Sequence, residues 1–503
     1  VVSNVAPALA VVGGQTIAEG GLLSLAVIGM FTDPGFDNPL NTIDPANGGE
    51  VAETFTYTIN WGDGTPLDAG VPTIDQVGGV GVLTAGSFGG EHIYADNGVY
   101  TVEVRVFDDD GGVALQTFVV TVTNVDPTLT GVDAPLTVDE GQAFTLAGLG
   151  VGVTDPGFDN PLNAGNAANG GEVEETFTGV SIDWGDGTPI VPVTVFPRVS
   201  GSPGVPTTAG LVHAPHTYAD NGLYTVTVQL SDDDGPVVSR TFQIQVNNVA
   251  PTLTLTTVEY VINEGQTLVI PDLAAFTDPG FDNPLNAGNA ANGGETAELF
   301  TYTIDWGDGT PLEFFAAPDV RTSGSPGVLT AGSFAGSHFY ADNDADNKYT
   351  ITVTLYDDDG GVDVKTIEVT VLNVNPTLDP LAATDVTSAG TTTLTLSFVD
   401  PGADSFEVLV DWGDKLHLPP ADRFVVATVY AGPTPETFVL VHQYQGPPDP
   451  LNPAADITIT VKIRDDDFHT PGVIQQGESN VQFVVISNPG TGQEFFFVEL
   501  TAR

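Results

Sequence analysis

The chain has 503 residues, and its 11 lysines and arginines against 66 aspartates and glutamates give a formal net charge of −55. Nucleic-acid binding needs clustered cationic side chains, and anionic membrane surfaces attract basic segments, so this charge excludes both kinds of partner. Cations are the partners that such a chain attracts. Hydrophobic residues still make up 41% of the chain and charged residues only 15%, which predicts folded cores rather than disorder.

Composition also sets how the fold is stabilised. Cysteine is absent, so the apolar cores, with metal ions as a further contribution, must hold the fold. No run of about 18 apolar residues is present, which argues against insertion into a membrane. The first residues, Val1-Val2-Ser3-Asn4, lack the basic and apolar regions of a signal peptide. For an exported protein, we expect that the signal has been removed or that these residues are part of a longer chain.

A short pattern, Asn-Val-x-Pro, recurs along the chain. It begins at Asn4, Asn124, Asn248 and Asn373, in steps of 120, 124 and 125 residues, and one Trp-Gly-Asp follows each copy. Similarity at a fixed period marks a repeat protein. We therefore predict a strand stub of a preceding repeat at residues 1–5, then repeat 1 (6–125), repeat 2 (126–249), repeat 3 (250–374) and repeat 4 (375–503).

Apolar and polar residues alternate within each repeat. In repeat 1, Phe55, Tyr57, Ile59 and Trp61 are separated by threonines and an asparagine. A period of two predicts half-buried strands, and no helical period is evident. The 59 glycines and 37 prolines divide these strands with turns, which favours antiparallel sandwiches.

The motifs of repeats 1 to 3 resemble those of the polycystic-kidney-disease (PKD) domain family. In repeat 1 they are Trp-Gly-Asp-Gly-Thr-Pro at 61–66, His-x-Tyr-Ala-Asp-Asn-Gly-x-Tyr at 92–100 and Asp-Asp-Asp-Gly-Gly at 108–112. The resemblance implies an all-β fold of four tandem immunoglobulin-like (PKD-type) antiparallel β-sandwiches in a linear array. It also implies a secreted protein that is extracellular or lies at the cell surface.

Repeat 4 departs from this pattern, and loop functions transfer to it less directly. Lys415 follows its Trp-Gly-Asp, and the Ala-Asp-Asn-Gly turn is missing after Tyr444. In repeats 1 to 3, Tyr100, Tyr224 and Tyr349 fall where immunoglobulin-like folds place a corner tyrosine, so we predict a structural role for them. The four tryptophans are expected to fill the cores.

Catalysis requires a nucleophile with a base, or two poised carboxylates in a pocket, and no such group is found. Cysteine and a Gly-x-Ser-x-Gly motif are both absent. His92, His216, His338 and His442 recur at one position of successive repeats, and an active site in every repeat is not expected. We therefore predict that the protein is not an enzyme.

Two acidic loops recur in register along the chain. The sequence Asp-Pro-Gly-Phe-Asp-Asn-Pro-Leu-Asn is identical at 33–41, 155–163 and 278–286, and three successive aspartates recur at 108–110, 232–234, 357–359 and 465–467. Both loops of an immunoglobulin-like sandwich emerge at the pole that carries the N-terminus, so their carboxylates should approach each other. A site of oxygen ligands without histidine or cysteine favours Ca²⁺ over a transition metal. The alternative is that these acidic loops bind no ion and are only solvated. The predicted calcium ligands are Asp33, Asp37, Asp108, Asp110, Asp155, Asp159, Asp232, Asp234, Asp278, Asp282, Asp357 and Asp359.

Other acidic residues are expected at the opposite pole, which meets the next repeat. They include Glu19, which begins a Glu-Gly pair, and Asp96. A second calcium site could combine Glu19 or Asp96 with the Asp155 loop of the next repeat. Only the analogy with cadherins, whose linkers such ions stiffen, supports this second site.

Two functions remain open from the sequence. The first is an extracellular structural or adhesive repeat protein that forms a calcium-stabilised rod, on the order of 150 Å for strands of ~10 residues at ~3.3 Å each. The alternative is an accessory glycan-binding segment of a secreted hydrolase, which would need an exposed aromatic platform. The candidates for such a platform are Phe36, Phe158, Phe281, Phe314 and Phe315.

Assembly with neighbouring subunits is a further expectation. Residues 1–5 match the end of a repeat, so either the array continues upstream or this stub docks on a neighbouring molecule, head to tail, in a surface filament. The strand-prone residues 493–500 are the candidate counterpart. The alternative is that they close the fourth sandwich. The partners expected are thus calcium ions, other copies of the chain, and cell-surface proteins or glycans.

Overall fold

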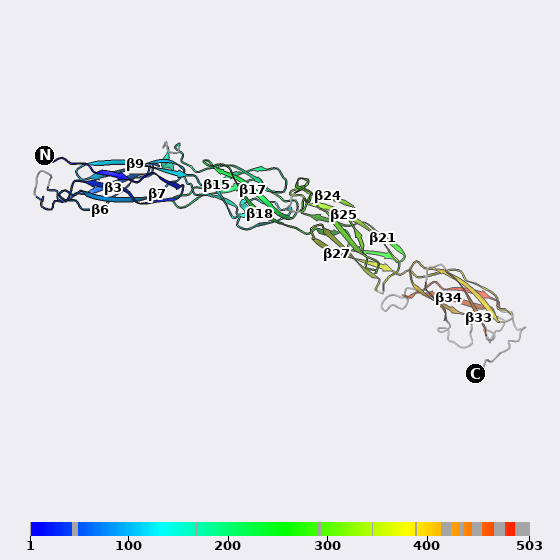
Figure 1. Cartoon of the computed structure of the whole chain (residues 1–503). Coiled ribbons are helices and arrows are strands. Elements are labelled where there is room, and N and C mark those ends of the chain that lie inside the picture. The colour runs from blue at the N-terminus through cyan, green and yellow to red at the C-terminus, as the bar shows by residue number, and fades with distance from the viewer. Residues whose placement is uncertain are drawn as a thin grey trace. The chain divides into compact units, whose positions relative to one another are not determined.

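The computed structural model describes residues 2–42, 49–165, 170–288, 293–344, 346–387, 390–413, 424–431, 436–444, 455–466 and 478–487. Strands form nearly all of the regular structure in these ranges, and the sheets occur in pairs that each enclose one apolar core (Figure 1). The predicted all-β fold of tandem immunoglobulin-like sandwiches is therefore confirmed.

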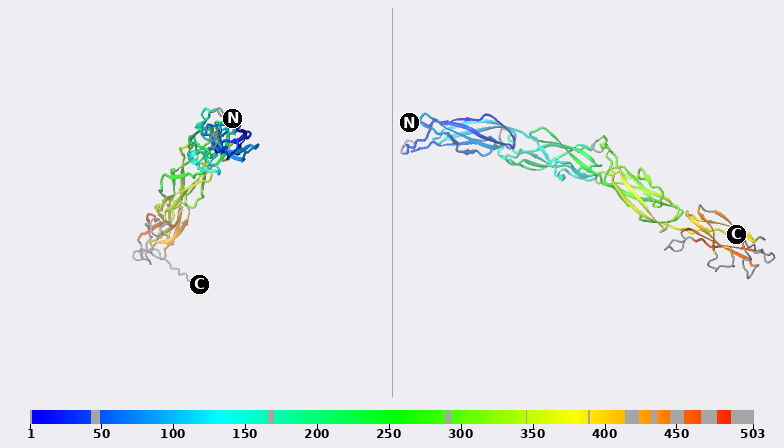
Figure 2. Two further views of the ribbon diagram at one scale, coloured as in Figure 1. Left: turned by 90° about the vertical axis from the view of Figure 1, so that its left-hand side faces the viewer. Right: turned by 60° about the horizontal axis from the view of Figure 1, so that its bottom comes forward.

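Repeat 1 shows the arrangement most completely. Its two sheets are antiparallel except where β2 runs parallel to β9, as the first strand of an immunoglobulin-like domain does when it changes sheets. The right-hand view in Figure 2 shows its strands, in blue, running from one pole of the repeat to the other. One sheet has the order β1 (Ala8–Val11), β3 (Leu22–Asp33), β7 (Thr84–Ile93) and β6 (Thr73–Gln76), and the other has β2 (Gln15–Ala18), β9 (Val113–Thr123), β8 (Gly98–Asp108), β4 (Phe55–Asn60) and β5 (Asp68–Gly70).

Repeat 2 has the same strand order and two short 3-10 helices, η1 (Ala147–Leu149) and η2 (Pro161–Asn163). Its sheets are β10 (Thr128–Thr130), β12 (Gly152–Asp155), β16 (Thr207–Val212) and β15 (Thr194–Val199), and β11 (Leu136–Asp139), β18 (Val238–Asn247), β17 (Gly222–Asp232), β13 (Phe177–Asp183) and β14 (Val191–Pro192).

Repeat 3 follows the same plan, with η3 (Pro284–Asn286) at the position of η2. Its sheets are β19 (Thr252–Leu255), β21 (Gln266–Asp278), β25 (Thr330–Tyr340) and β24 (Val320–Thr322), and β20 (Glu259–Asn263), β27 (Val362–Leu372), β26 (Lys348–Asp357), β22 (Phe300–Asp305) and β23 (Glu313–Phe315).

Repeat 4 is divergent in structure as in sequence. Its first sheet is built around β30 (Thr391–Val399), which pairs with β28 (Thr377–Leu378), β29 (Ala382–Ala383) and β33 (Glu436–Gln443). Residues 493–500, predicted to form a strand, lie outside the described residues. The second sheet has the order β32 (Val425–Ala431), β31 (Ser405–Asp411), β34 (Ile457–Arg464) and β35 (Gln482–Ile486).

Alternation along the strands places one apolar face of each sheet in the core. On β8, Tyr100, Val102 and Val104 are buried, whereas Thr101 between them is exposed. All four tryptophans are buried, and the Tyr100 hydroxyl donates to the Asp96 carbonyl at 3.0 Å, as a corner tyrosine does. The structural roles predicted for these aromatic residues are confirmed.

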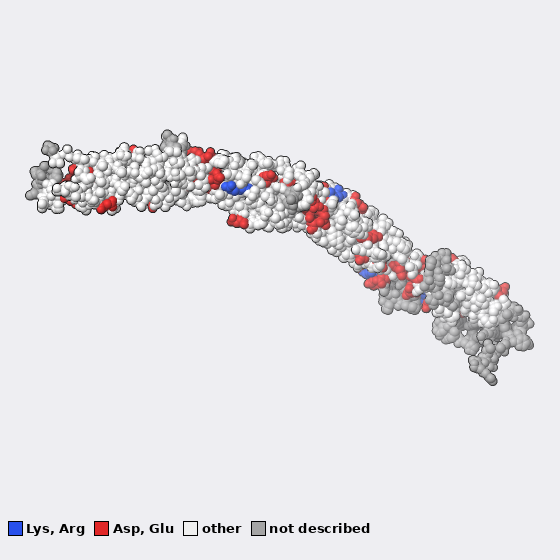
Figure 3. Space-filling view, in the orientation of Figure 1, with Lys and Arg blue, Asp and Glu red and all other residues white. Residues whose placement is uncertain are grey.

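By packing, the chain divides into two units. The first holds residues 1–248 with segments 280–297 and 325–328, and the second holds the rest of repeat 3 with repeat 4. No helix among the described residues is long and apolar enough to cross a membrane. On the face drawn in Figure 3, acidic side chains lie in small groups and few basic ones are visible.

Candidate metal centre at the repeat junctions

The two acidic loops of repeat 1 lie at one pole, as the topology predicts. Asp33 ends β3 and Asp108 ends β8. Burial raises the pKa of Asp33, the Gly35 amide opposes this shift, and the charges of Asp108 and Asp109 add to it. One carboxylate oxygen of Asp33, Oδ2, is buried and has no hydrogen-bond partner among the described residues. The loops are therefore close enough for their charges to interact.

The first aspartate of the triplet in repeats 1 and 2 binds the linker asparagine. Asn4 Nδ2 donates to Asp108 at 3.1 and 3.0 Å, and Asn124 Nδ2 donates to Asp232 at 3.2 and 3.1 Å. The Gly112 amide also donates to Asp108, at 2.6 Å. These bonds give the asparagine of Asn-Val-x-Pro a structural role that the sequence did not reveal. They also occupy part of the acceptor capacity of two predicted calcium ligands.

Asp37 and Asp159, the second aspartates of the long acidic loops, also have protein partners. Asp37 accepts the Glu53 amide at 3.0 Å. Asp159 accepts the Glu175 amide at 3.0 Å and two bonds from the Arg198 guanidinium, at 2.5 and 3.1 Å. Burial would raise the pKa of Asp159, but Arg198, with further hydrogen bonds, lowers it below its usual value. An arginine thus supplies the positive charge that calcium was expected to supply there.

An acidic group of the first unit lies where repeat 1 meets repeat 2. Glu19, Asp96 and Glu175 each place one carboxylate oxygen within 4.8 Å of the others. Glu19 follows β2, Asp96 lies in the turn between β7 and β8, and Glu175 precedes β13. Two repeats therefore contribute to one cluster, in which the predicted pair from repeat 1 meets a glutamate that the sequence did not single out.

Two of the three carboxylates in this cluster are buried, and Asp96 is half-buried. Glu19 is 2% exposed and Glu175 is 4% exposed. Burial, followed by the charges of Asp155 and Asp233, raises the pKa of Glu175 to about 10. Burial also raises the pKa of Glu19 to about 8, although the Val125 amide opposes this shift. Without a cation, burial therefore favours the protonated form of these two carboxyl groups.

Glycines allow the close approach of backbone and carboxylates at this junction. A Cβ at Gly157 would lie 2.2 Å from Glu175 Oε2, and a Cβ at Gly20, where φ is +65°, would lie 2.4 Å from the Pro156 carbonyl oxygen. A side chain at either position would displace the neighbouring repeat or the carboxylate. The Asp-Pro-Gly and Glu-Gly motifs therefore have a geometric reason, since both are needed where the two repeats touch.

Backbone contacts fix repeat 2 against repeat 1. The Phe158 amide donates to the Ala95 carbonyl at 3.0 Å, and Asn160 Nδ2 donates to the Asp63 carbonyl at 2.9 Å. A Cβ at Gly64, where φ is +79°, would lie 2.0 Å from the Leu162 carbonyl oxygen. The Phe-Asp-Asn-Pro-Leu segment of the acidic loop is therefore a docking segment, which explains why it recurs identically.

A second acidic group lies beside the first and shares Asp96 with it. Its other members are Glu172 and Asp234, and the three ligand oxygens lie within 4.8 Å of one another. Asp234 is one of the predicted calcium ligands, and it is exposed. Glu172 and Glu175 were missed, although the spacing Gly-Gly-Glu-x-x-Glu recurs in repeats 1 to 3 and was the signal that could have identified them.

The junction of repeats 3 and 4 in the second unit has a similar group. Glu264, Asp400 and Asp404 place ligand oxygens within 4.8 Å of one another. Glu264 accepts the Val374 amide at 2.5 Å, as Glu19 accepts the Val125 amide at 2.6 Å. Burial, followed by the charge of Glu264, raises the pKa of Asp404 to about 10. Repeat 4 lacks the long loop, and Asp404 takes the place of the missing glutamate.

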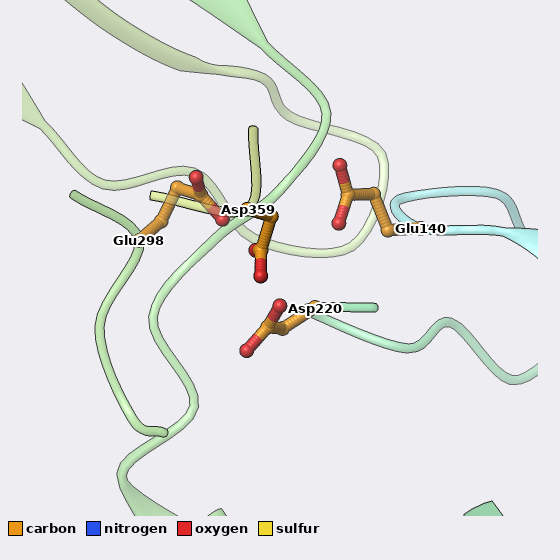
Figure 4. Close-up of side chains that lie close together, drawn as sticks. All are labelled: Glu140, Asp220, Glu298 and Asp359. Carbon is orange, nitrogen blue, oxygen red and sulfur yellow. The ribbon is translucent and has the colours of Figure 1, made fainter. Parts of the chain in front are cut away.

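Acidic pairs also lie at the remaining poles of repeats 2 and 3 (Figure 4). Glu140 and Asp220 of repeat 2 correspond in sequence to Glu19 and Asp96, and one oxygen of each lies within 4.8 Å of the other. In repeat 3, Glu298 and the predicted ligand Asp359 approach equally closely. Of the other predicted ligands, Asp110 is exposed, Asp282 is half-buried, and Asp155, Asp278 and Asp357 are buried.

The recurring histidines have structural partners. His92 stacks on Trp61, with ring centroids 4.8 Å apart, and its Nε2 lies 2.7 Å from Asp63 Oδ2. His216 makes the same pair of contacts in repeat 2. Each of these histidines thus links the core tryptophan to the Trp-Gly-Asp turn.

The phenylalanines predicted as a possible sugar-binding surface are mostly buried or lie apart from one another. Phe158 and Phe281 are 7% and 8% exposed, and Phe315 stacks on Tyr302 with centroids 4.4 Å apart. Phe314 is well exposed and Phe36 is only partly so. The described residues therefore do not present these phenylalanines as one flat surface for a sugar ring.

Comparison with known proteins gives only distant likenesses. No family model matches the chain, and no curated protein matches it. Sidekick-1 immunoglobulin domains 1–5 share 9% identity over 96% of this chain and 80% of theirs, with a TM-score of 0.25. Protocadherin gamma B7 extracellular cadherin domains 1–4 share 10% identity over 94% of this chain and 100% of theirs, with a TM-score of 0.24. At these scores the fold assignment rests on the sheet topology.

Proposed function

We propose that this chain is a structural or adhesive section of an extracellular protein, built of PKD-type repeats whose junctions are stabilised by calcium. The observation that carries the proposal is the burial of Glu175 of repeat 2 against Glu19 and Asp96 of repeat 1. Carboxylates in this position serve the contact between repeats rather than a substrate. Oxygen donors without histidine or cysteine suit Ca²⁺.

Recurrence supports a mechanical role. The Glu-Gly pair and the Asp-Asn turn occur in repeats 1 to 3, and the junction of repeats 3 and 4 forms its acidic group with a different residue, Asp404. A chemistry needed once would not require several copies. Fixed junctions would make the array a stiff rod, in keeping with proline-containing linkers that lack flexible Gly/Ser runs. Joining of such rods head to tail remains part of the proposal.

Differential scanning calorimetry of the whole chain tests this function. Calcium bound only by the folded state should raise the melting temperature by several degrees at millimolar concentration, and EDTA should reverse the shift. Magnesium at the same ionic strength is the control, because it demands a tighter octahedral geometry. Superimposable transitions in calcium, magnesium and EDTA would remove calcium from the proposal.

A further inference from the structure

The junction of repeats 1 and 2 offers more than a group of acidic side chains. Oε1 of Glu175 is buried and has no hydrogen-bond partner among the described residues. Neither Glu19 nor Glu175 forms an ion pair with a lysine, arginine or histidine in the described part of the chain. A buried carboxylate oxygen without a donor costs folding free energy unless a proton or a cation satisfies it.

The groups around this junction are mainly acidic. Asp155 is fully buried, its Oδ2 also has no partner among the described residues, and its charge is among those that raise the pKa of Glu19. Arg198 is close enough for the charge of Glu175 to raise its pKa, but its guanidinium donates its hydrogen bonds to Asp159. A cation from solution could therefore satisfy the buried carboxylate oxygens of this junction.

We propose that one Ca²⁺ ion binds between repeats 1 and 2, with Glu19 and Asp96 of repeat 1 and Glu175 of repeat 2 as its side-chain ligands. The inference rests on the proposed function for the choice of calcium, and it adds the ligands. The three oxygens lie within 4.8 Å of one another, and one calcium ion at 2.3–2.6 Å from each oxygen can bridge such a spacing. Backbone carbonyls and water complete the six to eight ligands.

The ion joins the two repeats directly. Glu175 belongs to the segment that leads into β13 of repeat 2, whereas Glu19 and Asp96 lie at the end of repeat 1. Glu19 also accepts the Val125 amide of the linker at 2.6 Å. One ion therefore couples the linker, the end of repeat 1 and the start of repeat 2.

Isothermal titration calorimetry of the whole chain with CaCl₂ tests the inference, with Glu175→Gln compared against Glu174→Gln. Glu174 is the adjacent residue and is exposed, so the second variant makes the same charge change outside the cluster. We expect Glu175→Gln to bind one calcium ion fewer than the wild type and Glu174→Gln to bind the full number.

Folding of the variant is checked by its melting temperature in EDTA. Glutamine removes an acid from a crowded buried group, so Glu175→Gln should melt at or above the wild-type temperature without calcium. The site assignment is wrong if Glu175→Gln binds as many calcium ions as Glu174→Gln. In that case calcium stabilisation of the wild type would still stand, whereas a wild-type chain that binds no calcium at millimolar concentration would overturn both proposals.

Discussion

The Glu19 carboxylate accepts a hydrogen bond of 2.6 Å from the backbone amide of Val125, which belongs to the linker that leads into repeat 2. Glu264 and Val374 repeat this relationship 2.5 Å apart at the end of repeat 3. A side chain from the early part of a repeat's sequence thus fixes the conformation of the linker that follows the repeat. The linker is therefore part of the folded repeat rather than a flexible tether.

Two substitutions of Glu19 should separate its linker role from its metal role. Glu19→Gln keeps an oxygen that can accept the hydrogen bond of the Val125 amide. Glu19→Ala removes this acceptor, which should lower the free energy of unfolding by about 1 kcal/mol. In EDTA, hydrogen exchange at peptides containing Val125 should be protected in Glu19→Gln and fast in Glu19→Ala. Both variants should lose one calcium ion. Equal exchange in the two variants would show that the hydrogen bond does not hold the linker.

Stability without calcium should fall as the pH rises from about 5 to 8. The folded chain holds protons on Glu175 and Glu19, whose pKa values are raised to about 10 and about 8, and the unfolded chain releases them near 4.5. Such a group stabilises the fold fully below its unfolded pKa, and this contribution is lost as the pH rises toward its folded pKa. Melting temperatures in EDTA at several pH values check the slope.

Glu175→Gln removes one of these acids, so its pH slope should be shallower than that of Glu174→Gln. Saturating calcium should flatten the wild-type slope as well, because the ion replaces the protons. A wild-type chain that becomes more stable in EDTA between pH 5 and 8 would contradict the buried, protonated state of the cluster.

Asp159→Asn should leave the number of bound calcium ions unchanged. Asp159 is bound by the Arg198 guanidinium at 2.5 and 3.1 Å, so its charge is already balanced. Loss of this partly buried pair should cost about 1 kcal/mol. Calcium titration of Asp159→Asn beside the wild type checks the count, and loss of an ion would instead support the site within repeat 2 that the sequence suggested.

Gly64→Ala should loosen the contact between repeats 1 and 2. The added Cβ would lie 2.0 Å from the Leu162 carbonyl oxygen of repeat 2. Gly309 is the matched control, because its φ is +81° against +79° at Gly64 but no atom of the described residues would lie within 4 Å of its Cβ. Both variants carry the same backbone strain. A lower melting temperature for Gly64→Ala than for Gly309→Ala therefore reports the stability lost at the contact between repeats 1 and 2. Equal melting temperatures would mean that the contact is not formed in solution.

The sequence predicted the strands, the buried tryptophans and the corner tyrosines because alternation and turn residues are local signals. It also placed Glu19 and Asp96 near the next repeat, since sandwich topology alone decides which loops share a pole. The same rule brought Asp33 toward Asp108. The sequence thus predicted which residues lie near one another.

Side-chain partners were harder to foresee. A long glycine-rich segment separates Glu175 from Asp155 in the sequence. Only the folded loop shows that Gly157 leaves room for the carboxylate of Glu175. The pairing of Asp159 with Arg198 was missed as well. A signal existed, because Arg198 and Arg321, two of only 11 basic residues, both stand two positions before Ser-Gly-Ser-Pro-Gly. A basic residue that recurs in register in so acidic a chain indicates a carboxylate partner.

The central claim is that a calcium ion fixes repeat 2 against repeat 1, and a distance measurement between the repeats tests it most directly. The chain has no cysteine, so spin labels can be attached at Thr117→Cys on β9 and Thr241→Cys on β18, which are both exposed. Double electron–electron resonance should give a narrower distance distribution in calcium than in EDTA. The same labels on Glu175→Gln should give no narrowing. Equal widths in calcium and EDTA for the wild type, or the same narrowing in Glu175→Gln, would contradict the account.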